Sequence, residues 1–340
     1  MTFSQTTDAG RWPVAQAQAW AETLPWLVGC NYVSSTAVND VEMWQVDTFD
    51  PETIKRELSW ARSLGMNSVR VFLNYVVWQA DPAGLKKRFE DFLQIAHEQG
   101  LGVMPIMFDD CAFAGKEPVT GPQDAPVPGV HNSGWVPSPG LLRVQDRDAW
   151  PMLEAYIKDM VGAFGQDARV IVWDLYNEPG NSGMGETSLP LVEATFAWAR
   201  VMEPLQPLTT GIWEDFTSPM SQRLMALSDV VSFHGYDMPE GVAAKLQLCG
   251  ESGRPLLCTE WLLRQGGNTV AAVLPLFRSK RVGCYNWGLV AGRTQTYMPW
   301  GSQPGDPMAK IWQHDLFHAD GTAYSDEERE IFQIQTGVTS

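Results

Sequence analysis

Two glutamates stand at the ends of apolar runs that have the length of buried β-strands. Glu178 lies near the end of the segment WDLYNEP (173–179), beside Asn177, and Glu260 lies near the end of LLCTEW (256–261). A protonated carboxyl and an ionised carboxyl can together cleave a bond to an anomeric carbon, because one protonates the leaving oxygen while the other attacks the carbon or activates water. Partial burial and mutual repulsion can separate their two pKa values in this way.

The elements that position these glutamates form a regular alternation between about residues 27 and 290. Short and almost continuously apolar runs, typical of parallel strands covered on both faces, alternate with amphipathic segments. The expected strands are 27–33, 68–75, 102–109, 170–178, 207–213, 230–237, 255–261 and 282–289. This order predicts an α/β fold, a (β/α)8 barrel whose fourth and seventh strands face each other across its mouth. We expect a single catalytic domain over residues 1–340, with the barrel core at about 27–318.

The segments between the strands have residues that typically begin and end helices. Asp50 is a plausible N-cap, Pro51 fits the first turn, and Gly65 is a stop. The predicted helices are 50–65, 85–100 and 148–165, with weaker patterns at about 188–203, 217–228, 239–249 and 268–280.

Two stretches are too long for ordinary connections in a barrel. Residues 111–142 follow the third strand and residues 291–310 follow the eighth, so both belong to the face where barrel active sites form. These stretches are either additions to the surface without a role in catalysis, or they form a wall or a lid of the active site. A pocket closed by both would mean exo action on a glycan, and an open groove would mean endo action.

Tryptophan is frequent, and its flat apolar ring can pack in a core or stack on a sugar. Several tryptophans lie near predicted strand ends or in the connecting loops, where either use is open. The candidates for substrate binding are Trp44, Trp135 and Trp300, and Trp78, Trp213 and Trp261 have similar positions.

Composition excludes several classes of partner. The net charge of −16 disfavours nucleic acids, anionic membranes and strongly acidic polysaccharides, so a neutral substrate fits best. No apolar run is long enough to span a membrane, and no signal peptide is visible. We expect a cytoplasmic protein, or a periplasmic or secreted one if the chain is a trimmed form. Protein partners are unknown.

The cysteines and histidines show no spacing typical of a metal site, so neither a metal nor another cofactor is expected. Three of the five cysteines, Cys30, Cys258 and Cys284, fall inside strand runs and should be buried. Four of the histidines are expected at the surface: His97, His131, His314 and His318.

On these residues the chain resembles the clan A glycoside hydrolases, and within them the cellulase-like family 5. Asn177-Glu178-Pro179 after strand four and Glu260 after strand seven match that clan's signature, and the resemblance extends over most of the barrel. The resemblance implies that Glu178 is the general acid/base, that Glu260 is the nucleophile of a retaining reaction, and that Asn177 holds the sugar 2-hydroxyl.

Four further residues match the family. Arg70 ends the second strand where the family has an arginine near the nucleophile, and His234 and Tyr236 match its His-x-Tyr on strand six. Trp287 matches the tryptophan beneath the −1 sugar. The resemblance implies that Arg70 and Tyr236 orient Glu260 and keep it ionised.

The chain departs from the family at the end of strand three, where Asp109-Asp110 stand in place of a frequent histidine. These aspartates either contact substrate or cap the loop, and the sugar stays open among β-glucan, β-mannan and related β-glycosides. The alternatives are a silent glycan-binding barrel and an exo-glycosidase acting on a rarer sugar, such as a furanoside. An aldolase would need a strand-end lysine, and a metal-dependent lyase would need clustered acids and histidines.

Overall fold

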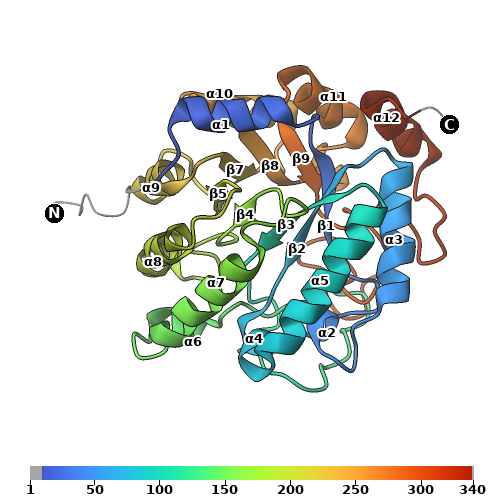
Figure 1. Cartoon of the computed structure of the whole chain (residues 1–340). Helices are drawn as coiled ribbons and strands as arrows, with labels where there is room; N and C mark the ends of the chain where they lie inside the picture. Colours follow the sequence, from blue (N-terminus) through green and yellow to red (C-terminus); the bar gives the residue numbers. More distant parts are fainter. Residues whose placement is uncertain (1–9, 339–340) are drawn as a thin grey trace.

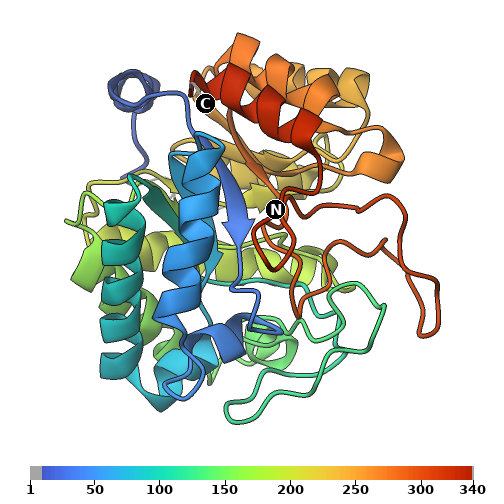
Figure 2. The same ribbon diagram turned by 90° about the vertical axis from the view of Figure 1, so that its right-hand side faces the viewer.

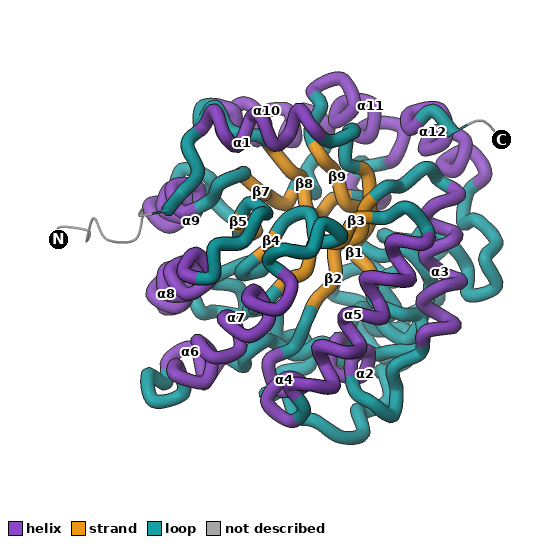
Figure 3. Tube along the Cα trace, in the orientation of Figure 1, coloured by secondary structure: helices purple, strands orange, loops and turns teal. Residues whose placement is uncertain are grey.

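We describe residues 10–338 of a computed structural model of the chain. Parallel strands form a barrel at the centre of the molecule, and helices surround it (Figures 1 and 3). The strands are β1 (Val28–Tyr32), β2 (Ser68–Phe72), β3 (Gly102–Ile106), β4 (Trp173–Asp174), β5 (Leu208–Thr209), β6 (Gly211–Ile212), β7 (Val231–His234), β8 (Leu256–Trp261) and β9 (Gly283–Asn286).

The barrel closes through its fifth expected strand, which is split into two. β5 pairs with β4, and β6 pairs with β7 on the other side, with Thr210 between them. β1 pairs with both β2 and β9, so the predicted eight-stranded (β/α)8 barrel is confirmed. Gly211 allows the backbone to approach the barrel interior closely here, since a Cβ at this position would lie 3.0 Å from Nε2 of His234.

The fourth expected strand is more irregular than its sequence suggests. Only two of its residues are strand, although Val170 and Asn177 each form an isolated bridge to the chain of β3 and its extension. Glu178 was expected to continue the strand but has a φ of +43°, outside the β region. The segment therefore turns sharply at the residue that projects into the barrel mouth.

Within residues 10–338 the predicted helices are present, together with five α-helices that were not predicted. Asp50 caps α3 as expected, because its side chain accepts a hydrogen bond from the Thr53 amide at 3.0 Å, and Gly65 has a φ of +78° after its end. The helices between the strands are α3 (Pro51–Ser63), α5 (Pro82–Glu98), α7 (Trp150–Phe164), α8 (Leu189–Val201), α9 (Pro219–Leu227), α10 (Pro239–Gly250) and α11 (Val270–Lys280). The additional ones are α1 (Val14–Thr23), α2 (Asp40–Trp44), α4 (Tyr75–Ala80), α6 (Leu141–Gln145) and α12 (Asp326–Thr336).

The long loops 111–142 and 291–310 lie side by side at one edge of the barrel mouth (Figure 2). Hydrogen bonds join them, including one from the Asn132 amide to the Thr294 carbonyl at 2.8 Å. Within residues 10–338, none of the helices has the length and hydropathy needed to cross a bilayer.

Candidate active site

Glu178 and Glu260 meet in one cavity at the C-terminal ends of the strands. The cavity has a volume of about 490 Å³ and is lined by both glutamates together with Asn177, His234 and Tyr236. One oxygen of each glutamate and one ring nitrogen of His234 all lie within 4.8 Å of one another. The fold therefore brings together the two carboxyls that stand 82 residues apart in the sequence.

Both oxygens of Glu178 have hydrogen-bonding partners. Oε1 lies 2.6 Å from Nδ1 of His234, and Oε2 accepts hydrogen bonds from Asn181 Nδ2 at 2.5 Å and Cys111 Sγ at 3.2 Å. The Ser182 amide donates to Asn181 Oδ1, and this fixes which end of the Asn181 amide faces the carboxyl. Positive φ in a non-glycine residue is uncommon and often marks a functional site, as at Glu178.

Glu260 has a permanent cation beside it, unlike Glu178. Arg70 Nη1 donates to Oε1 at 3.1 Å, and the Tyr236 hydroxyl donates to Oε2 at 2.8 Å. His234 Nδ1 lies 3.4 Å from the same Oε2, so the imidazole stands between the two glutamates.

Burial raises the pKa of both glutamates. It also lowers the pKa of His234 to about 3, so the imidazole is neutral at ordinary pH. Two negative charges this close repel each other, so the pair favours holding one proton. Because Arg70 faces Glu260, the single negative charge is best stabilised on Glu260 and the proton on Glu178.

Arg70 is fully buried, and three residues besides Glu260 fix its position. Nε and Nη2 donate to Asp174 Oδ2 at 2.9 and 2.8 Å, Nη1 donates to Asn31 Oδ1 at 2.6 Å, and Nη2 donates to Asn177 Oδ1 at 2.6 Å. One guanidinium thereby sets the positions of both Glu260 and Asn177.

The expected substrate contact of Asp109 and Asp110 is not found, because both lie behind the cavity wall. Asp109 accepts hydrogen bonds from Asn177 Nδ2 at 2.9 Å and Trp135 Nε1 at 2.7 Å, so it positions two residues that do line the cavity. Asp110 holds the turn after Glu178, accepting from the Tyr176 hydroxyl at 2.6 Å and the Gly180 amide at 2.7 Å. Both aspartates are structural, and the loop-capping alternative fits them.

Aromatic rings line the side of the cavity next to Glu260. Trp287 packs edge-to-face against Phe72 and Trp135, with ring centroids 5.7 and 6.0 Å apart. Trp300 is 48% exposed at the rim, and its ring lies 4.8 Å from that of Tyr236. Such surfaces can stack on the C–H faces of a sugar.

The prediction that Trp44 binds substrate is wrong. Its ring is fully buried in the core against Phe89 and Phe92, and its Nε1 donates to the Phe72 carbonyl at 2.6 Å. Trp78 and Trp261 are also buried in the core, whereas Trp213 lines the cavity.

Sequence reasoning missed several cavity residues. Cys111 and Asn181 both contact Glu178, and only the position of Asn181 three residues after Glu178 hinted at a role. The expected surface position of His314 was wrong, because this residue is fully buried, and the half-buried His131 lines the cavity. Their Nδ1 atoms lie 2.5 Å from the Leu262 carbonyl and 2.7 Å from the Met298 carbonyl, respectively.

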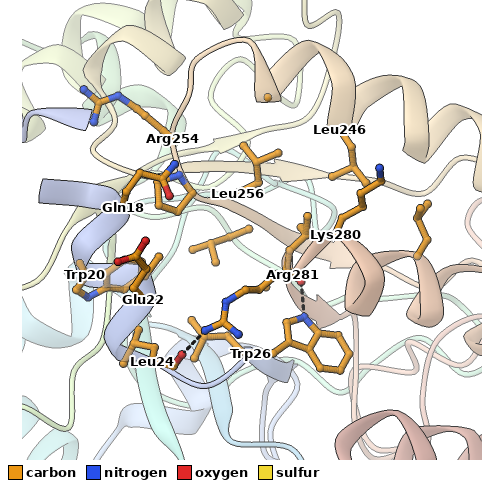
Figure 4. Close-up of a pocket in the computed structure, with 18 of the residues that line it drawn as sticks. Gln18, Trp20, Glu22, Leu24, Trp26, Leu246, Arg254, Leu256, Lys280 and Arg281 are labelled. Carbon is orange, nitrogen blue, oxygen red and sulfur yellow. Dashed lines mark hydrogen bonds between the residues drawn. The ribbon is translucent and has the colours of Figure 1, made fainter. Parts of the chain in front are cut away.

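A larger cavity of about 740 Å³ lies at the opposite end of the strands, between α1, α10 and α11 (Figure 4). Two of its polar side chains are bonded to the backbone: Trp26 Nε1 donates to the Val282 carbonyl and Arg281 Nη2 to the Leu24 carbonyl, both at 2.6 Å. Among the described residues that line it, Glu22 is the single carboxylic acid. This cavity therefore lacks the pair of acids that hydrolysis of a glycoside needs.

The trio of Glu178, His234 and Glu260 has donor atoms close enough to coordinate a cation. The fixed positive charge of Arg70, 3.1 Å from Glu260, opposes a second cation there. The donor set suits a hydrogen-bonded acid/base pair better than a metal centre.

Neither a family model nor a curated protein matches the sequence, but solved structures match the fold. An exo-β-1,4-mannosidase from an Opitutaceae bacterium (strain TAV5) is 17% identical with a TM-score of 0.64; the match covers 99% of this chain and 62% of that one. A subfamily 18 member of glycoside hydrolase family 5 from Bifidobacterium longum, solved with Manβ1-4GlcNAc, is 16% identical with a TM-score of 0.62 and coverage of 92% and 78%. An endo-β-1,4-mannanase from Thermotoga petrophila is 12% identical with a TM-score of 0.59 and coverage of 92% and 76%. The chain thus spans less than two thirds of the length of the first of these, and it has the (β/α)8 barrel fold of the family 5 glycoside hydrolases.

Proposed function

We propose that the chain is a retaining glycoside hydrolase that cleaves β-glycosidic bonds of a neutral oligo- or polysaccharide. The supporting observation is the approach of Glu178 and Glu260, which have carboxylate oxygens within 4.8 Å in one cavity. Retaining enzymes separate their two carboxyls by about 5–5.5 Å, whereas inverting enzymes leave roughly 6.5–9.5 Å for a water molecule.

In the first step, ionised Glu260 attacks the anomeric carbon and forms a glycosyl ester. The bond from that carbon to the glycosidic oxygen breaks, and Glu178 gives its proton to the departing oxygen. Arg70 and Tyr236 orient Glu260 for this attack, and their hydrogen bonds favour its ionised form.

In the second step, Glu178 is ionised and acts as a base. It takes a proton from water, whose oxygen bonds to the anomeric carbon while the ester to Glu260 breaks. Two inversions restore the original β configuration. Neutral His234 with its proton on Nδ1 donates to Oε1 of Glu178, and this hydrogen bond favours the ionised form that acts as the base.

Mannose is the first sugar to test. The similar solved structures include a mannosidase, a mannanase and a complex with Manβ1-4GlcNAc, although all are below 20% identity. The aromatic side of the cavity suits any pyranoside with an apolar face, so β-glucosides remain the second choice.

A panel of aryl β-glycosides and β-linked oligosaccharides tests the proposal. We expect turnover of one sugar class, with the β-anomer as the first product by proton NMR. Glu178→Gln should slow unactivated substrates by about 10²–10⁴-fold, because they need the proton most. An α-anomer as first product would contradict retention, and tight glycan binding without any turnover would favour the silent glycan-binding alternative.

A further inference from the structure

The two long loops cross part of the barrel mouth. They follow β3 and β9, and in the sheet these strands are separated by β2 and β1. Both loops also bond to the segment that follows β1, since the Asn39 side chain donates to the Gly134 carbonyl and the Arg293 amide donates to the Ser35 carbonyl. They therefore meet on the β1 side of the mouth, and Figure 2 shows them side by side there. We call the joined pair the clasped loops.

A single side chain makes much of the connection. Gln295, in one loop, donates from Nε2 to the Val127 and Val130 carbonyls of the other at 2.7 and 3.1 Å. Its Oε1 accepts from the Gly129 amide at 2.8 Å. The side chain is 7% exposed, so these hydrogen bonds are shielded from competing water.

Further bonds join the loops along their length. The His131 amide donates to Ser302 Oγ at 2.9 Å, its ring Nδ1 lies 2.7 Å from the Met298 carbonyl, and the Asn132 amide donates to the Thr294 carbonyl at 2.8 Å. Separate links at several points describe a fixed wall better than a flap that swings open.

The joined parts of the two loops stand on the nucleophile's side of the cavity. Trp135 from one loop packs against Trp287, and Trp300 from the other packs against Tyr236, the residue that donates to Glu260. The side next to Glu178 is bounded by Cys111, where loop 111–142 begins, and by residues after β4 and β6. There Asn181 contacts Glu178, and Trp213 donates to the Pro179 carbonyl at 3.1 Å.

The two sides of the cavity receive different parts of a glycan. The sugar attacked by the nucleophile lies on the non-reducing side of the broken bond, and the leaving group beside the acid lies on the reducing side. A wall beside Glu260 therefore limits the non-reducing part and leaves the reducing part free to extend. Resting on the proposed function, we propose that the clasped loops make this an exo-acting enzyme that releases single sugars from non-reducing ends.

The test compares free and capped chains. The wild-type protein is given mannohexaose and cellohexaose, and the same hexaoses with a 4,6-O-benzylidene cap on the non-reducing sugar. We expect a monosaccharide and a pentasaccharide as the first products of the free chain. The capped chain should be cleaved at about one hundredth of the rate of the free chain, or more slowly still. Early tri- or tetrasaccharides, or capped chains cut as fast as free ones, would overturn the proposal.

Aryl monoglycosides separate the two possible failures. Turnover of an aryl glycoside together with internal cuts in the hexaoses would reject exo action alone. If neither the aryl glycosides nor the hexaoses react, the proposed function itself is wrong, and the proposal of exo action is rejected together with it.

A variant tests the wall directly. Gln295→Ala removes three bonds between the loops and should raise the ratio of capped to free turnover by about tenfold, a loss of roughly 1.4 kcal/mol of discrimination. Gln303→Ala is the matched control, since Gln303 is exposed in the same loop and its side chain donates to the Gly301 carbonyl within that loop. If Gln295→Ala does not fold, Ser302→Ala removes the bond from the His131 amide and is used in its place. An unchanged ratio in a folded variant would overturn the role of the clasped loops.

Discussion

Arg70 and Asp174 form an ion pair beneath the two glutamates, with both side chains fully buried and 2.8 Å between Nη2 and Oδ2. A buried charge without a partner is costly, so Asp174 stabilises the cation that faces Glu260. An acidic residue in an otherwise apolar strand thereby influences the nucleophile without reaching the cavity.

Asp174→Asn should be strongly destabilising. The change keeps the side-chain shape but leaves Arg70 with Glu260 as its one remaining buried counter-ion among the described residues, and loss of one member of a buried pair costs about 3–5 kcal/mol. Denaturant unfolding measures the free energy. Asp91→Asn is the control, because Asp91 pairs with Lys87 at the surface and its loss should cost no more than about 1 kcal/mol. Equal losses in the two variants would show that the buried pair adds nothing.

Tyr236→Phe should move the acidic limb of the kcat/KM pH profile to higher pH. The hydroxyl donates to Glu260 at 2.8 Å and so favours the ionised carboxylate. Burial already raises the pKa of Glu260, and loss of this donor raises it further. A hydrogen bond to a charged group is worth about 1.5–3 kcal/mol, which corresponds to a shift of roughly 1–2 pH units. A profile that keeps its acidic limb while its height falls would contradict this role.

Cys111→Ala should move the alkaline limb of the kcat/KM pH profile to higher pH. The shift should be less than about 1 pH unit, because a thiol is a weak donor. Cys111 Sγ lies 3.2 Å from Glu178 Oε2, and burial raises the pKa of this thiol, so it stays protonated and can donate. Loss of the donor favours the protonated form of Glu178, whose pKa burial already raises. Cys111→Ser keeps a donor and should hold the limb in place; a shift of equal size in both variants would contradict the argument.

The barrel was predictable because its signals are local and repeated. Apolar runs mark the strands, and residues such as Asp50 and Gly65 mark where helices begin and end. The split of the fifth strand was not predictable, and it lies where Gly211 approaches His234, a residue distant in the sequence that a single sequence does not place beside it.

The site was predictable only where a residue type has few structural uses. Glu178 and Glu260 at strand ends fitted catalysis better than packing, and both lie in the cavity. Trp44 and Trp135 looked alike in the sequence, yet one is buried in the core and the other lines the cavity. Their difference arises from tertiary neighbours, which a single sequence does not display.

Gly211→Ala should reduce activity more than stability. An added Cβ would lie 3.0 Å from His234 Nε2 and 3.6 Å from Arg70 Nη2, so the imidazole must shift by a few tenths of an ångström. His234 contacts both Glu178 and Glu260, and small displacements in a catalytic group can cost about 10–100-fold in rate. The packing strain alone should cost about 1–3 kcal/mol, measured by unfolding.

Gly250→Ala is the control for this substitution. Gly250 is the last residue of α10, and a Cβ there would meet nothing within 4 Å. Alanine is about 1 kcal/mol better than glycine inside a helix, so this variant should be as stable as the wild type or more so, with unchanged kcat. If Gly211→Ala keeps full kcat while its melting temperature falls, the fifth strand supports the barrel but does not set the position of His234.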